Sequence, residues 1–118
     1  MTPDELEEII EKARIDQAYR LNLSGMQITH LPSSIGSLKR LTILDLDNNQ
    51  LTSLPDSICS LSKLNILNLD DNQLIKLPDN IGNLSKLNTL YSRNNQFKSL
   101  PDSIINLHNL SALYLDGN

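Results

Sequence analysis

One pattern of apolar residues recurs along most of this chain and limits what it can fold into. Leu41, Leu64 and Leu87 lie 23 residues apart, and each begins the pattern L-x-x-L-x-L-x-x-N-x-L-x-x-L-P-x-x-I. The third copy has Phe97 at one apolar position, and Ser92 is its one mismatch. A fixed period of this length, with constant apolar positions, indicates one structural unit per repeat and a stack of such units.

The L-x-L part of each unit predicts a short strand whose two leucines point to the same side. Successive units would place their strands about 4.8 Å apart in a parallel sheet, with the leucines forming one continuous core. We expect the L-P-x-x-I segment to return along the opposite side as a short helical or 3-10 turn. Pro55, Pro78 and Pro101 are predicted at the first residue of that turn, where a missing N–H costs little.

An asparagine follows each predicted strand. The turn at this point leaves backbone N–H and C=O groups facing the core without strand partners. A buried asparagine side chain both donates and accepts hydrogen bonds, so it can satisfy such groups in its own turn and in the adjacent one. We therefore predict a structural ladder of Asn49, Asn72, Asn95 and Asn118.

The N-terminal residues 1–17 carry the signals of an amphipathic helix. Thr2 can cap the helix, Pro3 suits its first position, and Glu5 completes a capping box. Apolar residues then recur on one helical face, at Leu6, Ile9, Ile10 and Ala13. We predict a capping helix that covers the exposed core of the first repeat. A docking arm for another protein is the alternative.

Residues 18–118 divide into five predicted repeats, of which the last is incomplete. The first repeat has Met26 where the ladder has asparagine in the others, with Gly25 before it to permit an unusual backbone shape. In the fourth repeat, the Ser92 hydroxyl either bonds to nearby backbone or leaves a tolerated void. The last unit stops at its ladder asparagine, which leaves Leu113 and Leu115 without a following repeat.

The repeated motif resembles the leucine-rich repeat family, whose signature is L-x-x-L-x-L-x-x-N-x-L. The resemblance covers about residues 18–118. It implies an α/β solenoid with a parallel sheet on the concave side and short helical turns on the convex side, and it implies non-catalytic protein binding on the concave face. The L-P-x-x-I form also resembles the N-terminal repeats of bacterial and cyanobacterial Roco-type proteins, which join such repeats to a Ras-like GTPase module, and the Ras-group leucine-rich proteins of eukaryotes.

Composition and charge narrow the expected partners and location. The net charge of −4 argues against nucleic acid and anionic membranes as main partners. A single cysteine, Cys59, forms no internal disulfide, and no apolar run suits a signal peptide or membrane span, so we expect a cytoplasmic protein.

The sequence offers no candidate for catalytic chemistry. His30 and His108 lie far apart, and neither has a partner at the spacing of metal ligands. No glycine-rich phosphate loop follows a predicted strand. We therefore expect no enzyme activity, no cofactor and no metal site.

The predicted binding face consists of the residues that alternate with the core leucines. Its exposed isoleucines adjoin a group of aspartates, which would attract a basic segment of a partner, while its tyrosines and arginine are types that dominate binding hot spots. The predicted face comprises Ile43, Asp45, Asp47, Ile66, Asn68, Asp70, Tyr91, Arg93, Tyr114 and Asp116.

The sequence thus favours a protein–protein interaction module, and two alternatives stay open. In the first alternative, the chain is a regulatory or targeting fragment of a larger protein, such as one containing a GTPase. A longer reading frame would reveal this. Alternatively, it is a structural unit that associates with itself through its uncapped C-terminal repeat, which light scattering would detect.

Overall fold

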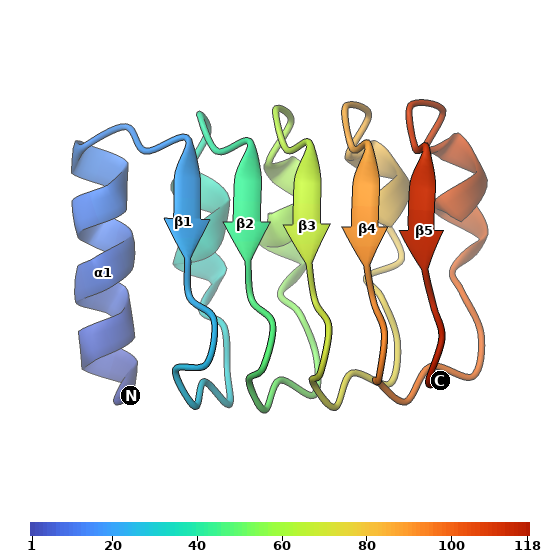
Figure 1. Ribbon diagram of the computed structural model, residues 1–118. Helices are drawn as coiled ribbons and strands as arrows, with labels where there is room; N and C mark the ends of the chain where they lie inside the picture. The colour runs from blue at the N-terminus through green and yellow to red at the C-terminus, as the bar shows by residue number, and fades with distance from the viewer.

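The computed structural model describes residues 1–118 as one open solenoid (Figure 1). Helix α1 (Pro3–Ile15) is followed by one strand per unit. The strands form a single parallel sheet in sequence order, which confirms the predicted α/β solenoid. They are β1 (Arg20–Asn22), β2 (Ile43–Asp45), β3 (Ile66–Asn68), β4 (Thr89–Tyr91) and β5 (Ala112–Tyr114).

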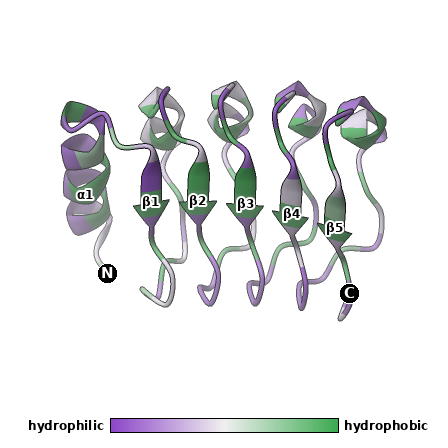
Figure 2. Ribbon diagram, turned by 45° about the horizontal axis from the view of Figure 1, so that its top comes forward, coloured by the Kyte–Doolittle hydropathy of each residue, from purple (hydrophilic) through white to green (hydrophobic).

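The pairing of the strands aligns equivalent residues of neighbouring repeats. Leu21 pairs with Leu44, Leu44 with Leu67, and Leu67 with Leu90, so the central leucine of each strand lies in one column. The central leucines of β1 to β4 and most leucines of the return segments belong to one core of 28 buried residues, against which the partly buried Leu100 and Leu113 pack. Figure 2 shows β2 and β3 as the most apolar strands and β1 as the most polar one.

The return segments are 3-10 helices on the other side of the core: η1 (Ser33–Ser37), η2 (Asp56–Ser60), η3 (Ile81–Asn83) and η4 (Asp102–Asn106). The predicted position of the prolines is wrong, because they precede these helices. Pro55 is extended, with φ −69° and ψ 145°, and its carbonyl accepts the N–H of Ile58 at 3.1 Å. This is the geometry of an N-cap, whose carbonyl accepts the first helical hydrogen bond. In the third unit Asn80 is the N-cap, and Pro78 lies two residues before it.

Helix α1 has the predicted capping box. The Glu5 N–H donates to Thr2 Oγ1 at 3.1 Å, and the Thr2 N–H donates to Glu5 Oε2 at 3.4 Å. The helix buries Leu6, Ile10 and Ala13, which join the core of the repeats. Its acidic residues remain exposed. None of the helices combines the length and the apolarity that crossing a membrane requires.

At one position in the turn after each strand, the backbone is in the left-handed region, and in the first repeat Gln27 is a second such residue, with φ 56°. The residues at this position are Gly25, Asn48, Asp71, Asn94 and Gly117, with φ values of 65°, 56°, 56°, 57° and 79°. Glycine, asparagine and aspartate enter this region at the least steric cost. The same turn therefore follows every strand, and it leads to the ladder asparagine in all repeats except the first, which has Met26 there.

Ser92 is the one irregularity within the core. Its side chain is fully buried, and its hydroxyl oxygen has no hydrogen-bond partner. Of the two alternatives for this residue, a hydrogen bond to nearby backbone is therefore wrong. Phe97, in the same repeat, takes the place that Leu51 and Leu74 hold in the preceding repeats and joins the core.

Candidate functional site

The solvent-facing side of the sheet, which is the predicted concave face and is called the outer face below, presents the residues that alternate with the core leucines. Strand pairing places Ile43 beside Ile66, and Ile66 beside Thr89, with all three side chains half-buried. The next column runs through Asp45 and Asn68 and ends in the two tyrosines. The face therefore changes along the solenoid, from aliphatic side chains on β2 and β3 to aromatic ones on β4 and β5.

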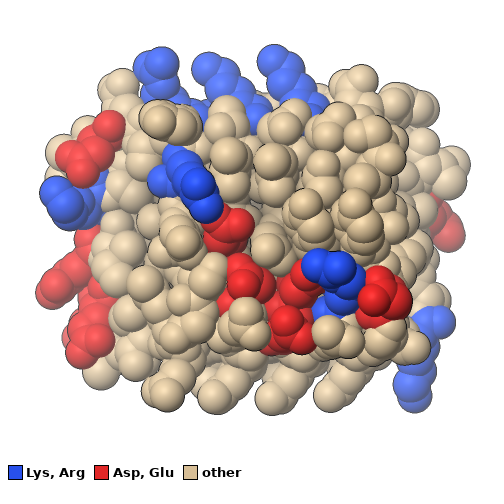
Figure 3. All heavy atoms as spheres, viewed as in Figure 1, with Lys and Arg blue, Asp and Glu red and all other residues tan.

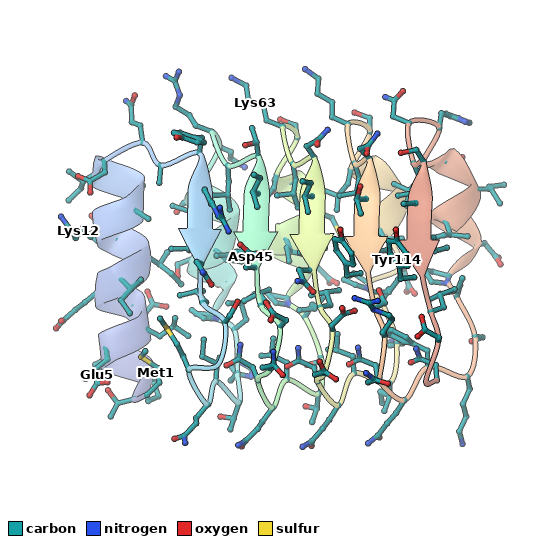
Figure 4. All side chains as sticks on the ribbon, viewed as in Figure 1. Met1, Glu5, Lys12, Asp45, Lys63 and Tyr114 are labelled. Carbon is teal, nitrogen blue, oxygen red and sulfur yellow. The ribbon has the colours of Figure 1, made fainter.

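Tyr91 and Tyr114 form an aromatic pair at the C-terminal end of this face. Their ring centroids are 5.0 Å apart, and their planes differ by 5°. The Arg93 guanidinium carbon lies 5.6 Å from the Tyr91 centroid and 5.2 Å from that of Tyr114. Figure 4 shows Tyr114 on the open side of β5. These three predicted residues form one contiguous cluster, in which stacking and cation–π attraction hold the side chains together.

Asp70, which follows β3, holds the Arg93 side chain in one conformation through hydrogen bonds. Its Oδ1 accepts the Arg93 backbone N–H at 2.7 Å, and its Oδ2 accepts Nε–H at 3.0 Å and Nη2–H at 2.8 Å. The side-chain hydrogen bonds to Asp70 and the charge of that carboxylate raise the pKa of the Arg93 guanidinium above its ordinary value. The prediction of Asp70 as an exposed carboxylate is wrong, since the residue is 7% exposed and both its oxygens are used internally.

The other aspartates of the face differ in their partners. Asp45 pairs with Arg20, whose Nη2 lies 3.1 Å from Oδ2. Arg20 was not among the predicted site residues, although it occupies the same column as Ile43 and pairs with it in the sheet. Asp47 accepts hydrogen bonds from the Ser24 hydroxyl at 2.5 Å and from the Asn48 amide at 2.9 Å.

Three carboxylates of this group form no ion pair, namely those of Asp47, Asp71 and Asp116. Asp71 accepts a hydrogen bond from the Asn94 side-chain amide at 2.8 Å, and Asp116 is exposed. Figure 3 shows acidic side chains gathered on the lower part of this face. Asp45, Asp47, Asp70, Asp71 and Asp116 are called the acidic band below. It carries less uncompensated charge than the sequence predicts, because Asp45 and Asp70 have ion-pair partners within the chain.

The ladder asparagines lie behind the face and shape the turns that follow the strands. The Asn72 amide donates to the carbonyls of Leu46, Leu69 and Asp70 at 2.9, 3.2 and 3.2 Å, and its Oδ1 accepts the Leu51 N–H at 3.0 Å. Equivalent bonds are made by Asn49, Asn95 and Asn118. Each asparagine links its own turn to the preceding repeat.

The cysteine and the histidines lie outside this face. Cys59 lies in η2 and is buried. This burial, and to a lesser extent the charge of Asp56, raises the pKa of its thiol to about 11. His30 and His108 are exposed in separate repeats. No three histidine, cysteine or acidic side chains are arranged to hold a metal ion.

Comparisons with known proteins agree with this architecture. A family model described as a leucine-rich repeat region matches residues 18–74. A leucine-rich repeat protein of Leptospira interrogans is 44% identical, with a TM-score of 0.77 over 78% of this chain and 24% of that chain. An internalin of Listeria monocytogenes is 35% identical, with a TM-score of 0.65 over 78% of this chain and 26% of that one.

A structure of the BIR3–SERK2 complex from Arabidopsis thaliana contains a chain that is 36% identical to this one. Its TM-score is 0.75, over 83% of this chain and 55% of that chain. The chain thus spans less than two thirds of each of these three structures. A search of curated proteins found no match.

Proposed function

The chain is a leucine-rich repeat protein, and on this premise we propose that it is a protein-interaction module whose partner binds the outer face of the sheet. The family and the similar structures support an interaction role in general. The BIR3–SERK2 structure is that of a complex, which supports a protein rather than a small molecule as the partner of this chain.

The observation that carries this proposal is the cluster of Tyr91, Arg93 and Tyr114. Tyrosine and arginine are enriched among the residues that dominate binding energy. Here the two rings are stacked, and Arg93 is held by three hydrogen bonds to Asp70. A partner would therefore meet side chains that are already ordered, which reduces the conformational entropy lost on binding.

The rest of the face extends this cluster into a larger surface. Ile43 and Ile66 are neighbours in the sheet and keep part of their apolar surface in solvent. Apolar side chains of a partner would remove this surface from water. The unpaired carboxylates of Asp47, Asp71 and Asp116 would attract a basic segment and set its orientation over the strands.

The test begins with a pulldown from the source organism, followed by identification of the bound protein. Affinity is then measured for the wild type and for Tyr91→Ala, Tyr114→Ala and the double variant. Tyr91→Ala should weaken binding by about 2 kcal/mol or more if it is a hot spot. Ser60→Ala and Ile105→Ala serve as controls, because both residues are exposed on the 3-10 side. Loss of binding in these controls, but not in the tyrosine variants, would place the site on the opposite surface.

A further inference from the structure

We propose a second interaction surface, at the edge of the solenoid formed by the loops that lead into the strands, which binds an acidic, extended peptide segment of a partner protein. The surface comprises Lys39, Arg40, Lys63 and Lys86, and is called the basic edge below. It is separate from the tyrosine cluster and does not depend on the function proposed above.

The repeat places the charges of the basic edge in a row. Arg40, Lys63 and Lys86 lie 23 residues apart, so each occupies the same position in its unit, and Lys39 adjoins the first of them. Figure 3 shows a row of basic side chains along the upper rim of the molecule, and Figure 4 places Lys63 on that rim. The spacing of neighbouring strands, about 4.8 Å, sets the approximate spacing of the row.

No carboxylate neutralises this row from within the same loops. Residues 38–42, 61–65, 84–88 and 107–111 contain no aspartate or glutamate. The ion pairs of the chain use other cations, namely Lys12, Arg14, Arg20 and Arg93. Arg40 donates only to the side-chain oxygen of Gln17, at 3.2 Å. All four cations of the basic edge are exposed, so their charges are available to a ligand.

Within the repeats, the two ends of the strands therefore differ in charge, although Lys76 and Lys98 also lie after the strands. Carboxylates gather beyond the C-terminal ends of the strands, and the basic edge lies before their N-terminal ends (Figure 3). Because the chain as a whole carries −4, the basic edge is a local exception to its overall charge. An anionic segment would be drawn to this edge and repelled from the acidic band.

A hollow of mixed polar and apolar lining lies at one end of the row and could receive one uncharged side chain. This hollow, of about 190 Å³, lies between the end of α1 and the first repeat. Its apolar lining residues are Ala13, Ala18 and Leu38, and its polar ones are Arg14, Gln17, Ser37, Lys39 and Arg40. A peptide that combines carboxylates with one aliphatic residue could place that residue here. Burial of apolar surface would then add to the exposed ion pairs, which are individually weak.

A peptide fits this surface better than a nucleic acid. Nucleic-acid binding depends on neutralising many phosphates, and the basic edge has only four cations. A phosphate backbone that spread from the edge over the sheet would also approach the carboxylates of Asp47 and Asp116. Lysine stems are flexible, so they can follow the carboxylates of an extended chain whose spacing differs from that of the repeats.

The experiment measures fluorescence anisotropy of a labelled oligoglutamate peptide that carries one leucine. The test variant is Lys63→Glu/Lys86→Glu, and the matched control is Lys76→Glu/Lys98→Glu. The control makes the same change in net charge at exposed lysines that lie in the segments after the strands. Circular dichroism establishes that both variants are folded.

We expect salt-sensitive binding of this peptide to the wild type, a roughly ten-fold or greater loss of affinity in the test variant, and less than a two-fold change in the control. Equal losses in the two variants would reduce the effect to net charge and overturn the proposal. The proposal would also be overturned if the peptide did not bind the wild type, or if single-stranded DNA of equal charge bound the wild type more tightly than the peptide. None of these outcomes bears on the tyrosine cluster, whose variants leave the basic edge unchanged.

Discussion

Asp70 and Arg93, one repeat apart, are joined by three hydrogen bonds that use both carboxylate oxygens, the guanidinium and a backbone N–H. The pair connects two adjacent repeats just beyond β3 and β4, and it holds the arginine against the stacked rings of Tyr91 and Tyr114. The intramolecular ion pair between Asp70 and Arg93 thus sets the conformation of the side chains that we propose for binding.

Asp70→Asn should lower the melting temperature and loosen the tyrosine cluster. The substitution removes the charge that balances Arg93 and replaces one acceptor oxygen by an amide that cannot accept from the guanidinium. Thermal unfolding and the near-ultraviolet circular dichroism of the tyrosines measure the two effects. Asp47→Asn is the control, because this residue forms no ion pair. Equal behaviour of the two variants would contradict a structural role for the pair.

Asn72→Ala should destabilise the protein by about 1–3 kcal/mol, because it leaves buried backbone groups of two repeats without partners. The relevant groups are the Leu51 N–H and the carbonyls that the Asn72 amide now satisfies. Urea unfolding measures the change in the free energy of unfolding. Gln73→Ala, at an exposed neighbour, should have little effect. An Asn72 variant as stable as the wild type would show that the ladder is dispensable.

Ser92→Ala should stabilise the protein, by about 1 kcal/mol. The hydroxyl is buried without a hydrogen-bond partner, and removing an unsatisfied polar group recovers part of its desolvation cost. The same urea experiment applies, with Ser99→Ala as a control at an exposed position. A loss of stability in Ser92→Ala would mean that the hydroxyl has a partner, such as a bound water molecule.

Much of this fold could be predicted from the sequence because one geometry is repeated. A residue that alternates with a core leucine in one strand does so in the others, and the period aligns Ile43 with Ile66 and Tyr91 with Tyr114. The contact between the two tyrosines follows from that alignment.

The parts that could not be predicted lie where strand alternation ends. Asp70 follows β3, in a turn whose left-handed residue redirects the chain, so alternation no longer fixes the exposure of its side chain. Its pairing with Arg93 also depends on side-chain conformation rather than on spacing. The sequence pattern misplaces Pro55 and Pro101 by one position because an N-cap and a first helical residue have similar φ and differ mainly in ψ.

Cys59 should react slowly with thiol reagents in the folded protein at pH 8. Its burial should also make the free energy of unfolding depend on pH above pH 9. Its pKa is raised from an ordinary 9.0 to about 11 in the folded state. The unfolded thiol therefore loses its proton first, and stability falls as the pH rises from about 9 to about 11. Comparing urea unfolding of the wild type with that of Cys59→Ala isolates this contribution from other titrating groups. A pH dependence that is identical in the two proteins would contradict the burial of the thiol.

Asp47 and Asp71 should control how fast a partner binds. Both carboxylates lack an ion-pair partner, whereas Asp70 is neutralised internally, so the field felt by an approaching basic segment comes largely from these two and Asp116. Once the partner is known, Asp47→Asn/Asp71→Asn should slow association several-fold at low salt and flatten its salt dependence, with a smaller effect on dissociation. Asp56→Asn/Asp102→Asn makes the same change in net charge on the 3-10 side and should leave the association rate nearly unchanged. Stopped-flow kinetics at several salt concentrations separates the two pairs. If both slow association equally, the whole-molecule charge steers the partner, and the acidic band has no special part in it.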